Sequence, residues 1–474
     1  MSTENPSSAV PSEAAEESLY QIHKTIHVRA VTGWFATWRW SMVWFTQALY
    51  YGLCWLPWNG RQAVLFDLAE RKFYIFGLIF WPQDLVFLAG LMIISAISLF
   101  LFTAVGGRLW CGYTCPQTVY TEIFLWIERK IEGDRMARMR LESASMGMRK
   151  LAIRGAKYGT WGAVALWTGF TFVGYFTPIK TLWAQVPTLS FGPWETFWIL
   201  FYGIWTYIFA GHLREQVCKY MCPYARFQGV MFDPDTLTIT YDQERGEPRG
   251  PRKKTVDYKA AGKGSCVDCS ICVQVCPTGI DIRDGLQYEC IGCAACIDAC
   301  DQVMDKMGYA KGLIRYSTEN AIAKHWGWKE IVDHIARPRV VIYATILATI
   351  VGIWGWGLAT KPSLRLDVLR DRATLAREVE HGMIENVYRL QIMNVSEEPR
   401  QLTIGVGGLV GMEVEGEAEH VVDVPAASNK TLTVQVRVPP DAGKPGSNPI
   451  YFELKSLNAA TVAAHEKATF LIPK

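Results

Sequence analysis

The sequence predicts a multi-domain integral membrane protein that joins a transmembrane α-bundle, an α+β insert and a C-terminal β-sandwich. Half of the 474 residues are hydrophobic and only 20% are charged, a balance typical of a membrane protein with soluble parts. Eight of the 13 cysteines fall in one stretch, residues 266–300. Residues 361–474 contain no cysteine and carry short segments in which apolar and polar side chains alternate. These differences predict three kinds of domain along the chain.

The N-terminal residues 1–38 are expected to form a disordered cytoplasmic tail. The first 20 residues are rich in Ser, Glu, Ala and Pro and contain no apolar run. A cleavable signal sequence needs a basic start and a short apolar core, and neither precedes the first long apolar segment. We therefore expect the first membrane span to act as the anchor.

Five segments are long and apolar enough to cross a bilayer. They are residues 39–58, 84–105, 158–176, 195–211 and 340–359. Trp and Tyr crowd the ends of most of them, as they do at membrane interfaces. The sequence therefore predicts a five-helix transmembrane bundle, with spans one to four in the domain 39–230 and the fifth span at 339–360.

Basic residues predict how the spans are oriented. Arg and Lys crowd the connections between spans two and three and between spans four and five, whereas the connection between spans three and four has only Lys180. By the positive-inside rule, the N-terminus and the two basic connections are cytoplasmic, and the C-terminal region lies outside. The segment 60–83, with Arg61, Arg71 and Lys72, fits this topology least well.

The stretch 266–300 contains two runs with the spacing C-x2-C-x2-C-x3-C. This is the pattern of bacterial two-cluster ferredoxins, in which the fourth cysteine of each run ligates the other cluster. A disulfide framework needs an oxidising compartment, and zinc sites usually use four ligands in two pairs. We therefore predict a cytoplasmic two-cluster ferredoxin-like α+β insert at 231–338. One [4Fe–4S] cluster is assigned to Cys266, Cys269, Cys272 and Cys300, and the second to Cys290, Cys293, Cys296 and Cys276.

A second pair of motifs has the spacing C-x3-C-P and follows the cytoplasmic ends of two apolar spans. The four cysteines are Cys111, Cys115, Cys218 and Cys222. Proline disfavours helical geometry for the residue before it and suits the first position of a helix, and residues 118–133 have helical periodicity. We therefore expect Cys115 at a helix N-terminus, where the dipole favours a thiolate.

Soft thiolates select Cu(I), zinc or iron–sulfur centres, so these four cysteines are candidates for a redox or metal site, with copper among the candidate metals. Two pairs of buried structural cysteines are the alternative. His212 precedes the second pair and is a candidate extra ligand.

The spans lack the facing histidines that a b-type haem needs, and no C-x-x-C-H motif for c-type haem occurs. Cys54 stands alone and is interpreted as a small apolar residue.

The C-terminal region 361–474 predicts an antiparallel sandwich of immunoglobulin type, built from about seven short strands. The clearest candidate strands are residues 387–395, 401–406, 431–438, 450–456 and 468–473. The region shows no catalytic constellation, which favours an interaction or docking module.

Motifs, order and topology together resemble the CcoG family, also called FixG or RdxA, whose members are accessory proteins of cbb3-type cytochrome c oxidase assembly. The resemblance rests on WCGYTCPQTVYTEIFLWIERKIEG, on LREQVCKYMCPYARFQGVMFD and on the two cysteine runs. Asp301 stands where proline follows the first run, and this looks like a family trait.

The resemblance implies a multi-pass protein of the bacterial inner membrane with two [4Fe–4S] clusters and a periplasmic immunoglobulin-like domain. It implies that the protein reduces Cu(II) to Cu(I) on the cytoplasmic side. The copper would then pass to a copper-exporting P-type ATPase and on to the copper centre of the cbb3-type oxidase.

Three functions stay open from the residues. The first is a cupric reductase in which an unknown cytoplasmic donor supplies electrons through the clusters to copper at Cys111, Cys115, Cys218 and Cys222. The second is a quinol-linked membrane ferredoxin conduit, and the third is an assembly scaffold without copper chemistry. The basic segment 249–254 predicts an inner-leaflet contact or a solvated linker, and no nucleic acid partner is expected.

Overall fold

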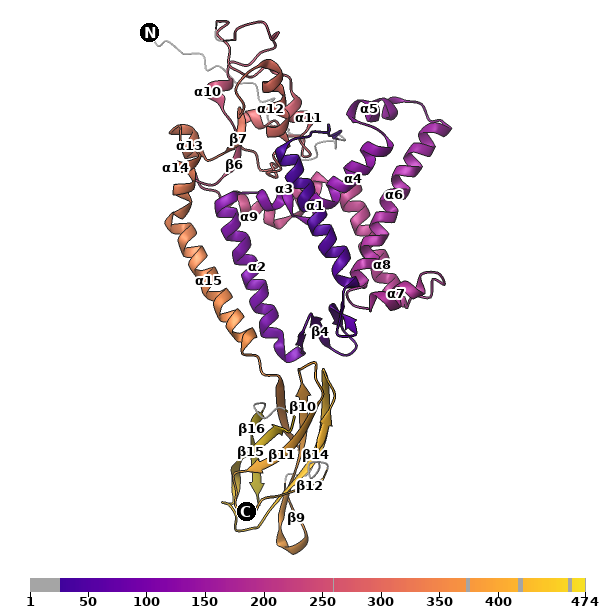
Figure 1. Ribbon diagram of the computed structural model, residues 1–474, viewed down its shortest axis with the longest axis vertical. Helices are drawn as coiled ribbons and strands as arrows, with labels where there is room; N and C mark the ends of the chain where they lie inside the picture. The colour runs from indigo at the N-terminus through magenta and orange to yellow at the C-terminus, as the bar shows by residue number, and fades with distance from the viewer. Residues whose placement is uncertain (1–25, 259, 372–375, 417–420, 459–462, 474) are drawn as a thin grey trace, which may run out of the picture. The chain divides into compact units, whose positions relative to one another are not determined.

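A computed structural model describes residues 26–258, 260–371, 376–416, 421–458 and 463–473 (Figure 1). The chain divides into two compact units. The first comprises the described residues of the ranges 26–44, 103–164 and 206–335, and the second comprises those of the ranges 45–102, 165–205 and 336–473. Most of the tail expected to be disordered, residues 1–25, lies outside the described residues.

The end of the predicted tail is already structured. Helix α1 (Trp34–Gly52) begins before residue 38, and Ala36 is buried. The amides of Phe35 and Ala36 donate to the carboxylate of Asp298, at 3.2 and 2.7 Å, so that a distant side chain satisfies the helix N-terminus. The expected boundary at residue 38 is therefore too late, because the capping group comes from far along the chain.

The first unit holds a set of helices that surround the C-x3-C-P motifs. They are α3 (Leu109–Tyr113), α4 (Pro116–Ile131), α5 (Arg135–Ser143), the first part of α6 (Met148–Val173) and α9 (Pro223–Met231). The helix expected at 118–133 is α4. Trp161 on α6 is fully buried and stacks on Phe124 of α4, with ring centroids 5.2 Å apart.

A buried carboxylate holds these helices together. Glu128 on α4 pairs with Arg138 on α5 at 2.8 Å and with Arg214 at 2.5 Å, and neighbouring Glu132 pairs with Lys157 on α6 at 2.8 Å. Removing one partner of such a buried pair typically costs about 3–5 kcal/mol, because it leaves an uncompensated charge.

The cysteine-rich part of the first unit has α+β structure. Its longest helix is α12 (Ala295–Met307), and the short helices are α10 (Gln243–Gly246), α11 (Ile271–Gln274), α13 (Glu319–Ala323) and α14 (Trp328–Asp333). Strands β6 (Thr238–Tyr241) and β7 (Ile314–Ser317) pair antiparallel, with Tyr241 opposite Ile314. Figure 1 shows these two strands beside α11 and α12.

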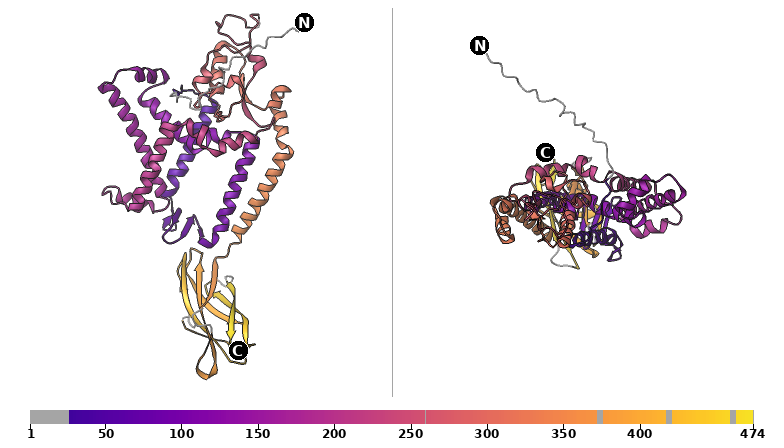
Figure 2. Two further views of the ribbon diagram at one scale, coloured as in Figure 1. Left: turned by 180° about the vertical axis from the view of Figure 1, so that it is seen from behind. Right: turned by 90° about the horizontal axis from the view of Figure 1, so that it is seen from above.

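In the second unit, α2 (Leu85–Gly106) and α15 (Pro338–Ala359) are the candidate membrane spans. Residues Pro82–Gly106 reach a mean hydropathy of 2.7 and Pro338–Ala359 reach 1.8. Almost none of their side chains is buried inside the protein, which suits contact with lipid rather than a protein core. Figures 1 and 2 show the two helices side by side, and the Trp354 indole donates to the Phe87 carbonyl at 2.9 Å.

Helices occupy most of each predicted span segment, although α1 ends at Gly52 and the last residues of the segment 39–58 form β1 (Pro57–Trp58). Only α2 and α15 have the length and apolarity of a span among the described residues. Helix α1 includes the buried Arg39, and the first turns of α6 carry four basic residues. Helix α8 (Pro193–Thr206) has 14 residues, about 21 Å at 1.5 Å per residue, and continues as a π-helix at Tyr207–Leu213. The five-helix bundle therefore stays a prediction for these three segments.

The segment 60–83 folds into a small sheet in place of an open loop. Strands β3 (Val64–Asp67), β4 (Lys72–Ile75) and β5 (Leu78–Phe80) pair antiparallel, after the short pair β1 (Pro57–Trp58) and β2 (Arg61–Gln62). Arg61 pairs with Glu397 and lies over the Tyr74 ring at 4.4 Å. Lys72 pairs with Glu70 at 3.3 Å. These partners compensate two of the three basic charges that fitted the predicted topology least well, those of Arg61 and Lys72.

The C-terminal region is a sandwich of two antiparallel sheets, as predicted. One sheet has the order β12-β14-β10-β8, with β9 beside β10, and the other has the order β13-β11-β15-β16. The strands are β8 (Leu364–Arg370), β9 (Arg377–Glu378), β10 (Ile384–Asn394), β11 (Arg400–Gly407), β12 (Glu413–Gly416), β13 (Val422–Val424), β14 (Ser428–Val438), β15 (Gly446–Ser456) and β16 (Ala463–Ile472).

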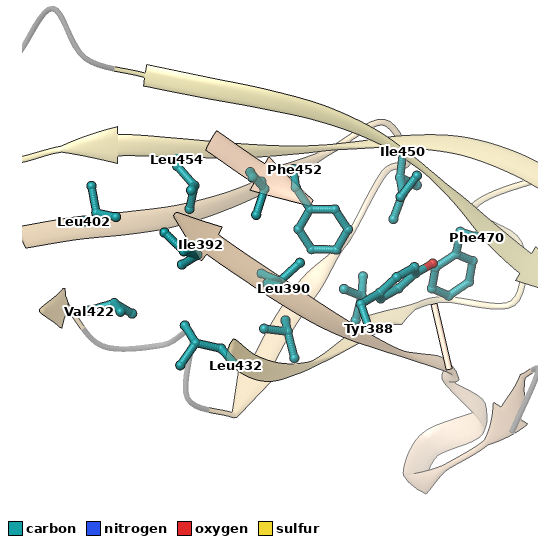
Figure 3. Packing of buried hydrophobic residues seen from close by; sticks show 14 of the residues in the cluster. Tyr388, Leu390, Ile392, Leu402, Val422, Leu432, Ile450, Phe452, Leu454 and Phe470 are labelled. Atoms are coloured by element: carbon teal, nitrogen blue, oxygen red, sulfur yellow. The ribbon is translucent and has the colours of Figure 1, made fainter. Parts of the chain in front are cut away.

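Several of these strands are longer than the short ones expected. Strands β10, β14 and β15 have 11 residues each, because polar residues on the outer face extend them beyond the apolar alternation. Inward-facing side chains such as Leu390, Phe452 and Phe470 are fully buried between the sheets (Figure 3). The fully buried Tyr388 donates its hydroxyl to the Thr469 carbonyl at 2.9 Å, which satisfies its polar end.

Candidate iron–sulfur and thiol site

Four cysteines from the two runs line one cavity in the first unit. They are Cys266, Cys269, Cys272 and Cys300, and the cavity has about 360 Å³ of empty volume. Its other walls are largely apolar and include Met304, Leu313 and Ile314. Cys300 comes from α12 in the second run, so the two runs cross over as the spacing predicts. Cys269 is the exposed member of this set.

The other four cysteines line a second cavity of similar size. They are Cys276, Cys290, Cys293 and Cys296, around about 340 Å³ of empty volume with isoleucine side chains between them. Cys272 also borders this cavity, so that the two cavities are neighbours.

The donor sets fit two [4Fe–4S] clusters. The first cavity is lined by four thiols and the second by its own four together with Cys272, and both have apolar side chains between the thiols, which is the chemistry that a cubane requires. Among the described residues, no group of three or more His, Cys, Asp or Glu side chains is arranged around a single ion. A cubane places its sulfur ligands on four different iron atoms, so its cysteines surround a cavity and need not converge on one point.

Left-handed backbone turns place the cysteines around the cavities. Ser270, with φ 53°, precedes α11, and Ala294, with φ 58°, precedes α12. Each turn lies between the second and third cysteine of its run, so the chain reverses direction there and wraps the thiols around the cavity. Serine and alanine pay a steric cost for this conformation, which marks both positions as constrained by the site.

The C-x3-C-P prolines act at helix starts as predicted. Cys115 and Cys222 are the residues that cap α4 and α9, with Pro116 and Pro223 at the first helical positions. Cys111 lies on α3, and Cys218 lies on a π-helical turn at Val217–Met221. Cys111 interacts electrostatically with Cys115 and Cys218, and Cys218 interacts with Cys115 and Cys222, so the four thiols share one neighbourhood.

The thiolate expected at Cys115 is not favoured in the absence of a metal. Burial raises the pKa of the Cys115 thiol above its ordinary value, although the amides of Thr118 and Gln117 oppose the shift. Burial also raises the pKa of Cys111 and Cys218 to about 12. Desolvation therefore outweighs the helix N-terminus, and a soft cation must displace the protons before these thiols become thiolates.

The C-x3-C-P motifs pack against residues next to the second cavity. Cys111 and Cys218 pack against the hydrophobic cluster that contains Cys293. A Cβ on Gly112 would lie 2.8 Å from the Gly292 carbonyl oxygen and 2.9 Å from the Cys293 nitrogen, so only glycine fits between the two motifs. Gly292 itself has φ 67°, a conformation that favours glycine.

Two side chains that sequence reasoning missed also hold Cys293 in place. The Arg39 guanidinium donates to the Cys293 carbonyl at 2.8 Å, and the Tyr316 hydroxyl donates to the Gly292 carbonyl at 2.6 Å. Arg39 sits in an apolar helix and Tyr316 on a short strand, so no local pattern marked them. The glycines inside both cysteine motifs were the available signal for the close contact.

His212 lies among aromatic rings. Its ring stacks on Tyr158 with centroids 6.1 Å apart and also contacts Trp161 and Tyr207. Its role as an extra ligand stays a prediction. Cys54 is fully buried among apolar side chains of the second unit, including Phe170 and Leu182.

Family models match most of the chain. A 4Fe-4S dicluster domain matches residues 213–319, and a 4Fe-4S binding domain matches residues 88–133, which include Cys111 and Cys115. A model described as an IG-like fold at the C-terminus of FixG matches residues 354–473. Together with the cysteine-lined cavities and the apolar spans, these matches define a membrane iron–sulfur electron-transfer protein.

Curated relatives match along nearly the full length. Protein RdxA of Cereibacter sphaeroides is 39% identical over 430 residues, which cover 89% of this chain and 90% of RdxA. Nitrogen fixation protein FixG of Rhizobium meliloti is 39% identical over 433 residues, covering 84% of this chain and 83% of FixG. Protein RdxB of C. sphaeroides is 38% identical over 445 residues, covering 91% and 92%. The chain belongs to the FixG, RdxA and RdxB family, which confirms the resemblance drawn from its motifs.

Proposed function

We propose that the protein is a membrane cupric reductase that serves assembly of a cbb3-type oxidase. Two [4Fe–4S] clusters would supply one-electron transfer from a cytoplasmic donor, and Cys111, Cys115, Cys218 and Cys222 would bind the Cu(II) that is reduced to Cu(I). The observation that supports this most directly is that Cys111 and Cys218 pack against the apolar cluster that contains Cys293, while Gly112 lies against the Cys293 backbone. Soft metal ligands therefore lie next to a residue assigned to a redox cluster.

The residue assignment follows the two cavities. Cys266, Cys269, Cys272 and Cys300 hold the first cluster, and Cys276, Cys290, Cys293 and Cys296 hold the second. When bound, the clusters supply one-electron transfer. The exposed Cys269 puts the first cavity at the surface, where a donor can approach, and the C-x3-C-P thiols adjoin the second. This order supports a path from solvent to copper.

The buried thiols of the C-x3-C-P motifs bind copper and keep it away from water. Buried thiols at Cys111 and Cys218 stay protonated until a metal arrives, so binding copper releases protons. One electron converts each Cu(II) to Cu(I), and thiolates prefer the softer product. Reduction thereby tightens the hold of the four sulfurs on the metal, and an acceptor with soft ligands is needed to take it away.

The membrane topology belongs to the same proposal. Five spans in the inner membrane place the cysteine-rich insert in the cytoplasm and the sandwich in the periplasm. A copper-exporting P-type ATPase then receives Cu(I) on the inner side, and the sandwich docks oxidase subunits on the outer side. In this proposal copper is reduced before export and inserted into the oxidase after export. The cysteine-rich insert and the sandwich are therefore needed on opposite sides of the membrane.

The decisive experiment removes the four C-x3-C-P thiols. Purified, cluster-loaded protein is reduced, freed of reductant and mixed with Cu(II), and Cu(I) is followed with a chromogenic chelator. Replacing all four cysteines by serine should leave iron content unchanged and abolish rapid reduction. A Cys54→Ala variant is the matched control, since it removes a thiol outside both sets. Undiminished reduction by the fourfold variant rejects the assigned copper site.

A further inference from the structure

A cavity that opens to solvent borders the thiol site in the first unit. Both Cys218 and Cys293 line it. It is therefore the space from which a ligand can reach the C-x3-C-P thiols next to the second cluster cavity.

The walls of this cavity are strongly basic. Five arginines line it against two glutamates, a formal excess of three positive charges. Glu128 lies outside the lining and pairs with two of the arginines, Arg138 and Arg214, so an excess of about two remains. A free aqua cation is repelled by such a wall.

Several of the guanidinium groups have unused donors. Arg39 and Arg138 are 7% and 5% exposed, and in the described part of the chain the Nε of each is buried without a hydrogen-bond partner. Arg29 and Arg129 have no ion-pair partner among the residues described here. Buried donors without partners are costly, so the Nε groups of Arg39 and Arg138 indicate an anion that completes them. Arg29 is exposed and Arg129 is half-buried, and both add positive charge to the lining.

We propose that this cavity binds copper as a small, carboxylate-bearing anionic chelate. The inference rests on the proposed function and names the form in which its substrate arrives. The arginines hold the chelator's carboxylates, because planar guanidinium groups pair bidentately with them. Cys218 then takes the metal by exchange: a copper–oxygen bond to the chelator breaks, a copper–sulfur bond forms, and the thiol proton passes to a released carboxylate.

The test measures anion binding without copper. Radiolabelled citrate is dialysed to equilibrium against purified, full-length, cluster-loaded protein in detergent. We expect saturable binding that weakens with salt, and at least tenfold weaker binding for the double variant Arg29→Gln, Arg129→Gln. Arg140→Gln, an exposed arginine on α5 outside the cavity, is the matched control and should bind as the wild type does. Iron content is measured for every variant.

The outcomes separate this inference from the proposed function. No citrate binding, equal binding by the double variant and the control, or equally tight binding of inorganic phosphate overturns the carboxylate site. Cys218→Ser should bind citrate normally and lose copper retention. If citrate binds as expected while the fourfold cysteine variant still reduces copper, the chelate site stands and the assigned copper site falls.

Discussion

The closest test of the contact between the two cysteine motifs is the substitution Gly112→Ala. The added methyl group would meet the Gly292 oxygen at 2.8 Å and backbone atoms of Cys293 at 2.9 Å. All three obstacles are backbone atoms, so no side-chain rotation relieves the clash. Ordinary contact begins near 3.4 Å, so one motif must move away from the other by roughly half an ångström.

The cost of that movement falls on the second cluster cavity. Overpacking of a well-packed interior costs about 1–3 kcal/mol. Because about 1.4 kcal/mol is a tenfold change in an equilibrium constant, the fraction of open, cluster-losing molecules should rise roughly 5- to 150-fold. Gly112→Ala should therefore release iron from the second cluster faster and reduce Cu(II) more slowly than wild type.

The assay follows cluster absorbance and protein-bound iron during incubation with an iron chelator. Gly155→Ala on α6 is the matched control, because a Cβ there meets nothing within 4 Å. Alanine favours a helix interior, so this control should be neutral or slightly stabilising. If Gly112→Ala retains iron and reduces copper like Gly155→Ala, the two motifs are not held in contact and the proposed electron path loses its support.

Three further outcomes follow from single contacts. Glu128→Gln removes the buried carboxylate that pairs with Arg138 and should lower thermal stability by about 3–5 kcal/mol, as seen in a shifted melting curve. Although burial opposes ionisation of Asp242, hydrogen bonds from Arg315 and a backbone amide hold its pKa below the ordinary value. Its contribution is thus present above about pH 4 and lost as pH falls further, so Asp242→Asn should flatten acid denaturation followed by fluorescence. Leu390→Ala in the sandwich core should cost about 2–5 kcal/mol in the free energy of unfolding, measured by urea denaturation.

Much of the site could be predicted because its signals are local. The interval between cysteines decides which thiols can reach one cluster, and each predicted group of four lines its own cavity, with Cys272 bordering both. Proline after Cys115 and Cys222 decides where the next helix begins. Alternation of side chains decides which faces of β10 and β14 point inward. Each of these rules acts within a few residues.

The features that could not be predicted depend on residues that are distant in the sequence and are brought together by the fold. The N-terminal position of Cys115 favours a thiolate, but the burial that reverses this preference comes from residues brought in by the fold. The membrane spans were inferred from apolar composition, which does not register that Arg39 in α1 has a buried partner at the Cys293 carbonyl. The span predicted at 39–58 stays a prediction, and the structure adds that the N-terminal end of α1 is bound to the cysteine-rich part.

Contacts between residues distant in the sequence also connect α1 to helix α12 of the ferredoxin-type part. Asp298 lies between Cys296 and Cys300, which are assigned to different clusters, and its carboxylate accepts the first amides of α1. A Cβ on Gly33 would lie 2.3 Å from the Asp298 carboxyl carbon, so the chain needs glycine there to approach at all. With Arg39 bound to Cys293 one turn further on, α1 is anchored at two points beside the cluster cavities. A helix start that depends on a residue between cluster ligands couples the order of this segment to the cysteine-rich fold. We therefore expect cluster assembly and the placement of α1 to be coupled.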